Sequence, residues 1–128
     1  EKKILIDTGA SSNFLKNAQM CGISIKDVDA GILTHAHYDH ANGLNAFFKE
    51  NSTAKFYLQK ACKENCYSSR KFYNRYIGIK KGTLEKYKDR FEFIENTYKL
   101  IDGVTLVPHN TEQNIAPKSE KIEIKYHR

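Results

Sequence analysis

The chain has 128 residues, a formal net charge of +6 and a hydrophobic fraction of 40%. This length suits one domain with a modest core. Mean hydropathy is −0.65, and no apolar run approaches the roughly 20 residues of a membrane-spanning helix, so we expect no membrane segment. Its three cysteines, Cys21, Cys62 and Cys66, form no even disulfide framework, which predicts free thiols and a cytoplasmic protein.

The first predicted strand covers residues 2–7, where apolar side chains point to both faces of the strand, so we expect both faces to be buried. Gly9 permits a tight turn into a helix that ends near Gly22, where glycine suits the left-handed stop. A second strand closes at residues 32–34, directly before a cluster of histidines.

Residues 34–43 read Thr-His-Ala-His-Tyr-Asp-His-Ala-Asn-Gly and form the most informative stretch of the chain. Neutral imidazoles and a carboxylate are ligands that zinc and similar divalent metals prefer. In an extended segment His35 and His37 point the same way and can share one metal. Asp39 and His40 follow where a helix begins, and would face a second metal about 3.5–4 Å away. A histidine-rich surface loop is the alternative.

The remaining elements predict an α/β layer architecture, because strands and helices alternate over residues 2–59. Ala41 and Gly43 are small, so the start of the helix after the histidine cluster can pack closely against its surroundings. The further expected elements are helices at 39–50, 60–66 and 83–89, strands at 55–59, 91–94, 98–101, 104–107 and 121–126, and loops at 67–74 and 110–119.

Residues 60–81 concentrate the positive charge, with seven lysines and arginines against Glu64 alone. Tyrosine and phenylalanine residues are interleaved with these cations. We predict that Arg70, Lys71 and Arg75 bind an anionic small-molecule substrate by charge and stacking. Two alternatives remain open: a lysine-rich solvated surface whose tyrosines pack inward, and a site for single-stranded nucleic acid.

The segment from His35 to His40 resembles the His-x-His-x-Asp-His motif of the metallo-β-lactamase superfamily. Upstream, residues 4–10 (Ile-Leu-Ile-Asp-Thr-Gly-Ala) are similar to that superfamily's strand ending in Asp-Thr-Gly, and residues 27–34 resemble its lead into the metal loop. The resemblance is close over residues 2–60 and looser to about residue 107. The sequence around the motif and at residues 76–79 is similar to sequences of one branch of the superfamily, the metal-dependent hydrolases or dihydropterin-type synthases.

This resemblance implies a partial αββα sandwich, with residues 1–128 forming one partial domain from the front half of the fold. It implies zinc, or else manganese or iron, on His35 and His37 at the first site and on Asp39 and His40 at the second. Asp39 would also orient the attacking water and take its proton. Asp7 would order the metal loop through hydrogen bonds; an ordinary turn aspartate is the alternative.

The chain departs from the family pattern after residue 60, since no later segment matches the family's third histidine, bridging aspartate and last histidine. His109 and His127 are the only later histidines. His109 follows a strand-like run, so it would lie either at a strand end near the site or in a solvated loop. We expect His127 to belong to the C-terminal tail. We therefore expect the front half of a larger protein, with an incomplete, metal-poor site and a tendency to form homo-oligomers.

The sequence thus predicts a metal-dependent hydrolase that acts on an anionic small molecule. Two other functions stay open. One is a non-catalytic binding module for a nucleotide or RNA, and the other is an enzyme similar to the pterin-pathway synthases.

Overall fold

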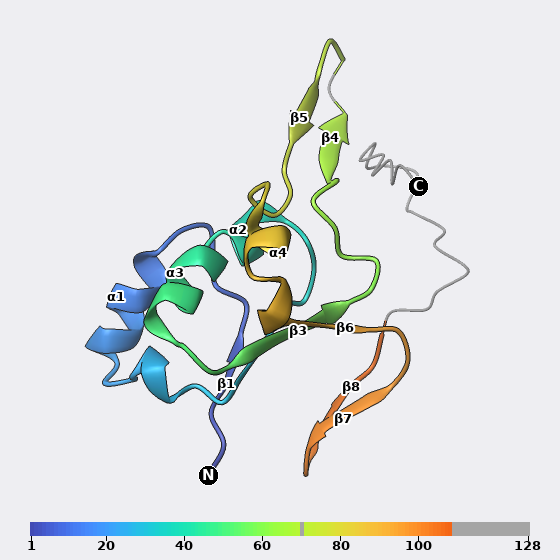
Figure 1. Cartoon of the computed structure of the whole chain (residues 1–128). Coiled ribbons are helices and arrows are strands. Elements are labelled where there is room, and N and C mark those ends of the chain that lie inside the picture. Colours follow the sequence, from blue (N-terminus) through green and yellow to red (C-terminus); the bar gives the residue numbers. More distant parts are fainter. Residues whose placement is uncertain (70, 109–128) are drawn as a thin grey trace.

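The computed structural model describes residues 1–69 and 71–108, and its centre is a four-stranded parallel sheet (Figure 1). The strands lie in the order β1 (Ile4–Ile6), β2 (Ala30–Ile32), β3 (Lys55–Gln59) and β6 (Phe91–Ile94). All three neighbouring pairs are parallel. Parallel strands need crossover connections, and helices supply them here. The predicted α/β class is confirmed.

The helices leave one face of the sheet buried against a single apolar core. They are α1 (Asn13–Met20), α2 (Tyr38–Ala41), α3 (Leu44–Glu50) and α4 (Thr83–Lys86), with 3-10 turns η1 (Ile25–Asp27) and η2 (Lys88–Arg90). Phe47 of α3 is fully buried and packs edge-on against Phe56 of β3, with ring centroids 4.9 Å apart. Across residues 1–69 and 71–108 no helix has the length and apolar character to cross a membrane.

Two antiparallel hairpins extend from this layer (Figure 1). The first pairs β4 (Tyr67–Ser69) with β5 (Asn74–Tyr76), and the second pairs β7 (Tyr98–Ile101) with β8 (Val104–Leu106). The predicted helix at 60–66 and loop at 67–74 are therefore wrong. Cys62 and Cys66 are both buried in the core, and the Cys66 carbonyl accepts a hydrogen bond from the backbone N–H of Ile77 at 3.0 Å. Tertiary pairing with residue 77 replaces helical pairing in this segment.

The strands predicted at 91–94 and 98–101 are confirmed, and the strand at 104–107 is confirmed with its end at Leu106. The expected loop at 110–119 and strand at 121–126 lie outside the described residues.

The predicted helix at 39–50 is wrong in one respect, because it is broken into α2 and α3 at Asn42 and Gly43. The Gly43 N–H donates to the Gly9 carbonyl at 3.2 Å. A Cβ at Gly43 would lie 2.4 Å from the Thr8 carbonyl oxygen, closer than any real contact of this kind. The break therefore lets two backbones meet beside the histidine cluster, which is the close packing that the small residues predicted.

Gly43→Ala is expected to lower the free energy of unfolding by about 1–3 kcal/mol, because the added methyl group has no space against Thr8. Urea unfolding followed by circular dichroism measures this change. Lys49→Ala, on the exposed side of α3, is the matched control and should stay within about 0.5 kcal/mol. Equal unfolding midpoints for the two variants would show that the backbone approach at Gly43 is not tight.

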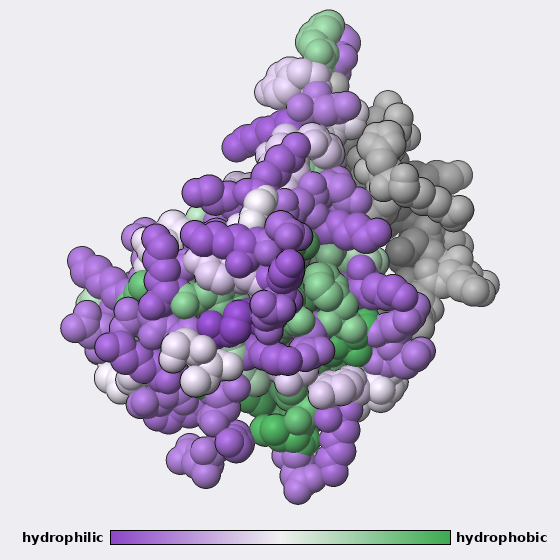
Figure 2. Space-filling model, viewed as in Figure 1, coloured by the Kyte–Doolittle hydropathy of each residue, from purple (hydrophilic) through white to green (hydrophobic). Residues whose placement is uncertain are grey.

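The second face of the sheet is only partly covered, so the prediction that residues 2–7 are buried on both faces is wrong. Ile6 is 63% exposed. The β7–β8 hairpin covers part of this face, and Tyr98 packs near Tyr57 with ring centroids 5.6 Å apart. Figure 2 shows mostly hydrophilic surface over the β4–β5 hairpin and hydrophobic surface lower in the view, where the sheet and the second hairpin lie.

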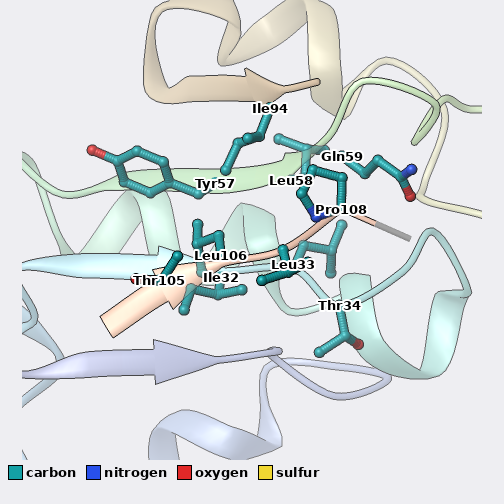
Figure 3. A pocket seen from close by; sticks show the side chains of 11 residues that line it. Ile32, Leu33, Thr34, Tyr57, Leu58, Gln59, Ile94, Thr105, Leu106 and Pro108 are labelled. Carbon is teal, nitrogen blue, oxygen red and sulfur yellow. The ribbon is translucent and has the colours of Figure 1, made fainter. Parts of the chain in front are cut away.

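A cavity of about 320 Å³ lies between this second face and the end of the β7–β8 hairpin. Ile32, Tyr57 and Ile94 line it from the sheet, while Leu106 and Pro108 close it from the other side (Figure 3). Thr34 also lines this cavity, so it reaches the start of the histidine cluster.

The three cysteines differ in accessibility, and this predicts their reactivity. Cys21 is exposed, whereas burial raises the pKa of the Cys62 thiol to about 11 and also raises the pKa of Cys66. The thiolate is the reactive form, and at pH 8 a pKa near 11 leaves about one thiol in a thousand ionised. We expect iodoacetamide to modify Cys21 alone in the native chain and all three cysteines in urea, as counted by mass spectrometry. Rapid native modification of Cys62 would contradict its burial.

Candidate metal centre

The site begins at Asp7, directly after β1, where the backbone takes a left-handed conformation with φ +57°. Aspartate tolerates this region better than most residues, and such conformations cluster at functional sites. The Asp7 N–H still donates to the Ile32 carbonyl at 2.8 Å, which continues the pairing with β2. The carboxylate is thereby turned toward the loop that carries the histidines.

The Asp7 carboxylate accepts three hydrogen bonds from this loop. Its Oδ1 accepts from the Thr34 N–H at 2.8 Å, and its Oδ2 accepts from the Thr34 hydroxyl at 2.7 Å. The same Oδ2 lies 2.8 Å from Nδ1 of His40. The expectation that Asp7 orders the metal loop agrees with these contacts. They also account for a carboxylate that is largely removed from water, since such a group needs hydrogen-bond donors.

The hydrogen-bond partners in this network favour one tautomer for each imidazole. An ionised carboxylate only accepts, so Nδ1 of His40 is the donor to Asp7. The Thr34 hydroxyl has one proton and gives it to Asp7, while its oxygen also lies 2.9 Å from Nδ1 of His35. Nδ1 of His35 must then donate to Thr34. In the neutral form of either ring, a proton on Nδ1 leaves the lone pair on Nε2, the atom that can then bind a metal.

Backbone contacts hold His40 in place at the same time. Its carbonyl accepts hydrogen bonds from the Thr8 N–H at 2.8 Å and from the Thr8 hydroxyl at 3.1 Å. Thr8 is fully buried, and Gly9 forms a backbone bridge with Ala41. The start of α2 is therefore fastened to the turn after β1, two segments that lie about 30 residues apart in the sequence.

His35, Asp39 and His40 form one group whose ligand atoms all lie within 4.8 Å of one another. The rings of His35 and His40 have centroids 4.0 Å apart, and the carboxylate of Asp39 lies 3.7 Å from Nε2 of His40. Burial, followed by the charges of His40 and His37, lowers the pKa of His35. A lowered pKa keeps this imidazole neutral at neutral pH, which is the form that binds metals.

His37 lies beside this group rather than in it. Its ring meets that of His35 edge-on with centroids 4.7 Å apart. Its backbone pairs with Gly78 in an isolated antiparallel bridge, which ties the loop to the segment after β5. The division into a His35–His37 site and an Asp39–His40 site stays a prediction, because the structure gathers three of these four side chains together.

The donor set fits zinc. Catalytic zinc sites use three protein ligands from histidine and carboxylate and keep one position open. His35, Asp39 and His40 supply such a set. Ligand atoms around one tetrahedral zinc lie roughly 3.3 Å apart, given bonds of about 2.0–2.1 Å. The three ligand atoms lie within 4.8 Å of one another, and 3.7 Å separates Asp39 from His40, so the group must draw together to hold one ion. Two histidines and one carboxylate also suit iron.

The predicted substrate-binding residues that the structure describes lie on the first hairpin, and only Arg75 lines a cavity beside the metal loop. Arg75 is in β5 and Lys71 in the turn before it, and both are exposed. Arg70, His109 and His127 lie outside the described residues. Sequence reasoning missed Thr34, whose hydroxyl links Asp7 to His35. The sequence placed Thr34 next to His35, but it did not show that Thr34 contacts Asp7, which lies 27 residues away.

Sequence reasoning also passed over Lys80 and Lys81 as individual binding residues. Both belong to the basic segment, and both line a cavity of about 350 Å³ beside α2. The sequence showed only that both lysines belong to the basic segment, and this did not distinguish them from its other lysines.

Comparison with known proteins places the chain in a family. A model of the metallo-beta-lactamase superfamily matches residues 1–117. One similar solved structure is the metallo-beta-lactamase GOB-18 from Elizabethkingia meningoseptica, with 44% identity over 45% of this chain and 22% of that chain and a TM-score of 0.41. Another is a B3 metallo-beta-lactamase with an active-site glutamic acid, with 19% identity over 75% of this chain and 37% of that chain and a TM-score of 0.49.

The chain therefore spans well under half the length of either of these proteins. No curated protein is a significant match to the sequence. The superfamily model nevertheless covers most of the chain, including the Asp7 turn and the whole histidine cluster. On that coverage, the chain belongs to the metallo-beta-lactamase superfamily.

Proposed function

We propose that the protein is a metal-dependent hydrolase in which His35, Asp39 and His40 hold zinc, or else manganese or iron. The observation that carries this proposal is the Asp7–Thr34 network, which leaves an Nε2 lone pair on both histidines beside an exposed carboxylate. A solvated loop has no need of such orientation. Membership of a superfamily of metal-dependent hydrolases supports the same conclusion.

Each residue of the site has a distinct part in the proposed reaction. A bound zinc ion supplies a Lewis acid that lowers the pKa of water from about 15.7 towards 7. The carboxylate of Asp39 is 56% exposed, so it can accept a hydrogen bond from the attacking water and take its proton. Asp7 is largely buried and committed to the loop, so it holds the ligands and does not handle the substrate.

The proposed substrate is an anionic small molecule. Lys71 and Arg75 form no ion pair with any residue of the described ranges, so their charge is available to an anion. Both lie on the hairpin that follows the metal loop. Arg70 belongs to the same proposal from its place in the sequence.

A non-catalytic module that binds a nucleotide or RNA is the second candidate function. The observation that favours it is a pair of exposed aromatic side chains in the turn of the first hairpin, Phe72 at 87% and Tyr73 at 64% exposure. Nucleic-acid bases stack on such side chains, and neighbouring cations hold the backbone.

The experiment that separates the two functions is a chelator test. The chain is stripped with EDTA, reloaded with zinc, and tested on chromogenic β-lactam, phosphomonoester, phosphodiester and thioester substrates. The hydrolase proposal expects turnover of at least one class that disappears with EDTA and returns with zinc. Absence of zinc binding, together with salt-sensitive binding of single-stranded RNA that EDTA does not change, would favour the binding module.

A further inference from the structure

A positively charged cavity lies on the other side of α2 from the core, next to the metal loop. It has a volume of about 350 Å³ and is lined by Tyr38 of α2, by Asn42 directly after that helix, and by Arg75, Tyr76, Lys80 and Lys81 of the segment from β5 to α4. Among the residues that the structure describes, no aspartate or glutamate lines it. Three cations that share one small cavity repel one another, so this arrangement favours an anion between them.

The cations of this cavity lack the carboxylate partners that other lysines have. Lys2, Lys55 and Lys60 each pair with an acidic side chain. Over residues 1–69 and 71–108, no such pair involves Arg75, Lys80 or Lys81. Glu64 is the nearby acid, and its two oxygens accept from the N–H groups of Gly82 and Leu84 at 2.6 and 2.8 Å. It caps the start of α4 instead of neutralising the lysines.

Lys81 is held in place by two tyrosines. Its Nζ donates to the Tyr67 hydroxyl at 3.0 Å and lies 5.0 Å from the centre of the Tyr76 ring. The Tyr76 hydroxyl donates to the Ile79 carbonyl, and burial raises the pKa of Tyr76 to about 12, so this phenol stays neutral. A lysine fixed by aromatic contacts loses less conformational freedom when it binds an anion than a free lysine does.

The cavity is also fastened to the metal loop by main-chain contacts. The Tyr38 N–H donates to the Ile77 carbonyl at 2.8 Å, and the Lys80 N–H donates to the Asn42 side chain at 3.2 Å. Tyr38 begins α2, the helix that also carries Asp39 and His40, and Asn42 follows directly after its end. The cavity and the metal group therefore share the α2 segment.

We infer that the cavity lined by Arg75, Lys80 and Lys81 binds a phosphate group of the substrate, while the bond to be hydrolysed lies at the metal group. This inference rests on the proposed hydrolase function and assigns the anionic part of the substrate to a defined place. Phosphate is the favoured class because a dianion matches several unpaired cations better than a single carboxylate does. Lys80 and Lys81 are the central residues of the site.

Inorganic phosphate is the probe, titrated into the metal-free chain and followed by amide chemical shifts. We expect shifts at residues 75–81 and at Tyr38, with affinity reduced about tenfold for each cation removed in Lys80→Gln/Lys81→Gln and in Arg75→Gln. The matched control is Lys16→Gln/Lys49→Gln, which removes two exposed lysines from α1 and α3 and gives the same net charge. It should bind phosphate as the wild type does.

Equal weakening in the two double variants would overturn the inference, because it would assign the effect to overall charge. Failure of phosphate to shift residues 75–81 would overturn it as well. A third result is that the chain binds oligo(U) much more tightly than phosphate, with this binding lost in the Lys80→Gln/Lys81→Gln variant. That result would overturn the inference of a small phosphate compound and assign the cavity to nucleic acid. Zinc affinity, measured separately, should not change in this variant, so a failed metal site and a failed phosphate site give different results.

Discussion

We expect His40→Ala to lower the affinity of the chain for zinc by at least about 100-fold. His40 contributes one of the three ligand atoms of the group, and its Nδ1 donates a hydrogen bond to the Asp7 carboxylate. Loss of an outer partner of a ligand typically costs 10- to 100-fold in metal affinity, so loss of the ligand itself should cost more. Competition with a fluorescent zinc chelator measures the affinity, and circular dichroism checks that the variant is folded.

His37→Ala is the matched control for this experiment. It removes a neighbouring imidazole from the same loop and leaves His35, Asp39 and His40 in place. We expect this variant, after reloading, to bind as much zinc as the wild type does, as counted by elemental analysis. If His37→Ala loses zinc as completely as His40→Ala, the three-residue group is not the metal site. The pairing of His35 with His37 then describes it better.

Asp7→Asn is expected to weaken zinc binding about 10- to 100-fold without removing any ligand. Asparagine has one side-chain acceptor atom, whereas the two oxygens of Asp7 together accept from Thr34 twice and from His40 once. Asparagine also tolerates the left-handed backbone at this position, so the turn itself is preserved. The free energy of unfolding should fall by roughly 1.5–3 kcal/mol, the value of a hydrogen bond to a charged group.

Thr34 variants separate the effect of the hydrogen bonds that join Asp7, Thr34 and His35 from general damage to the loop. Thr34→Ser keeps the hydroxyl that joins Asp7 to His35, and Thr34→Val removes it while the backbone bond to Asp7 remains. Imidazole nitrogen shifts in the metal-free protein report the position of the proton. We expect hydrogen on Nδ1 of His35 in the wild type and Thr34→Ser, and a mixture in Thr34→Val. Identical spectra for the two variants would show that the Thr34 hydroxyl does not set the position of the proton on His35.

The sequence revealed the chemistry of the site because its ligands are close together in the chain. Four ligand-type residues within six positions need little more than local geometry to converge. The α/β class was also predictable, since strands and helices alternate before residue 60. Strand β3 at Lys55–Gln59 and strand β6 at Phe91–Ile94 match their predicted bounds because their apolar patterns are strong.

The two wrong predictions of secondary structure, at residues 39–50 and 60–74, share one cause. The break between α2 and α3 and the hairpin of β4 and β5 depend on contacts with Thr8 and Ile77, which lie far from the affected residues or in another element. Local pattern alone favoured one long helix and a short one. Tertiary contacts decide between such alternatives, because the local energy differences between them are small.

What the sequence by itself determined is the set of atoms available for chemistry: imidazoles and a carboxylate after a strand, and a basic aromatic segment behind them. The tertiary structure decided which atoms of that set can act. Asp7 and Thr34 meet across two strands and leave Nε2 free on His35 and His40, and residues 75–81 fold against α2 so that unpaired cations face one cavity. The positions of the protons and the grouping of the cations depend on distances between side chains that are far apart in the sequence, and only the fold sets those distances.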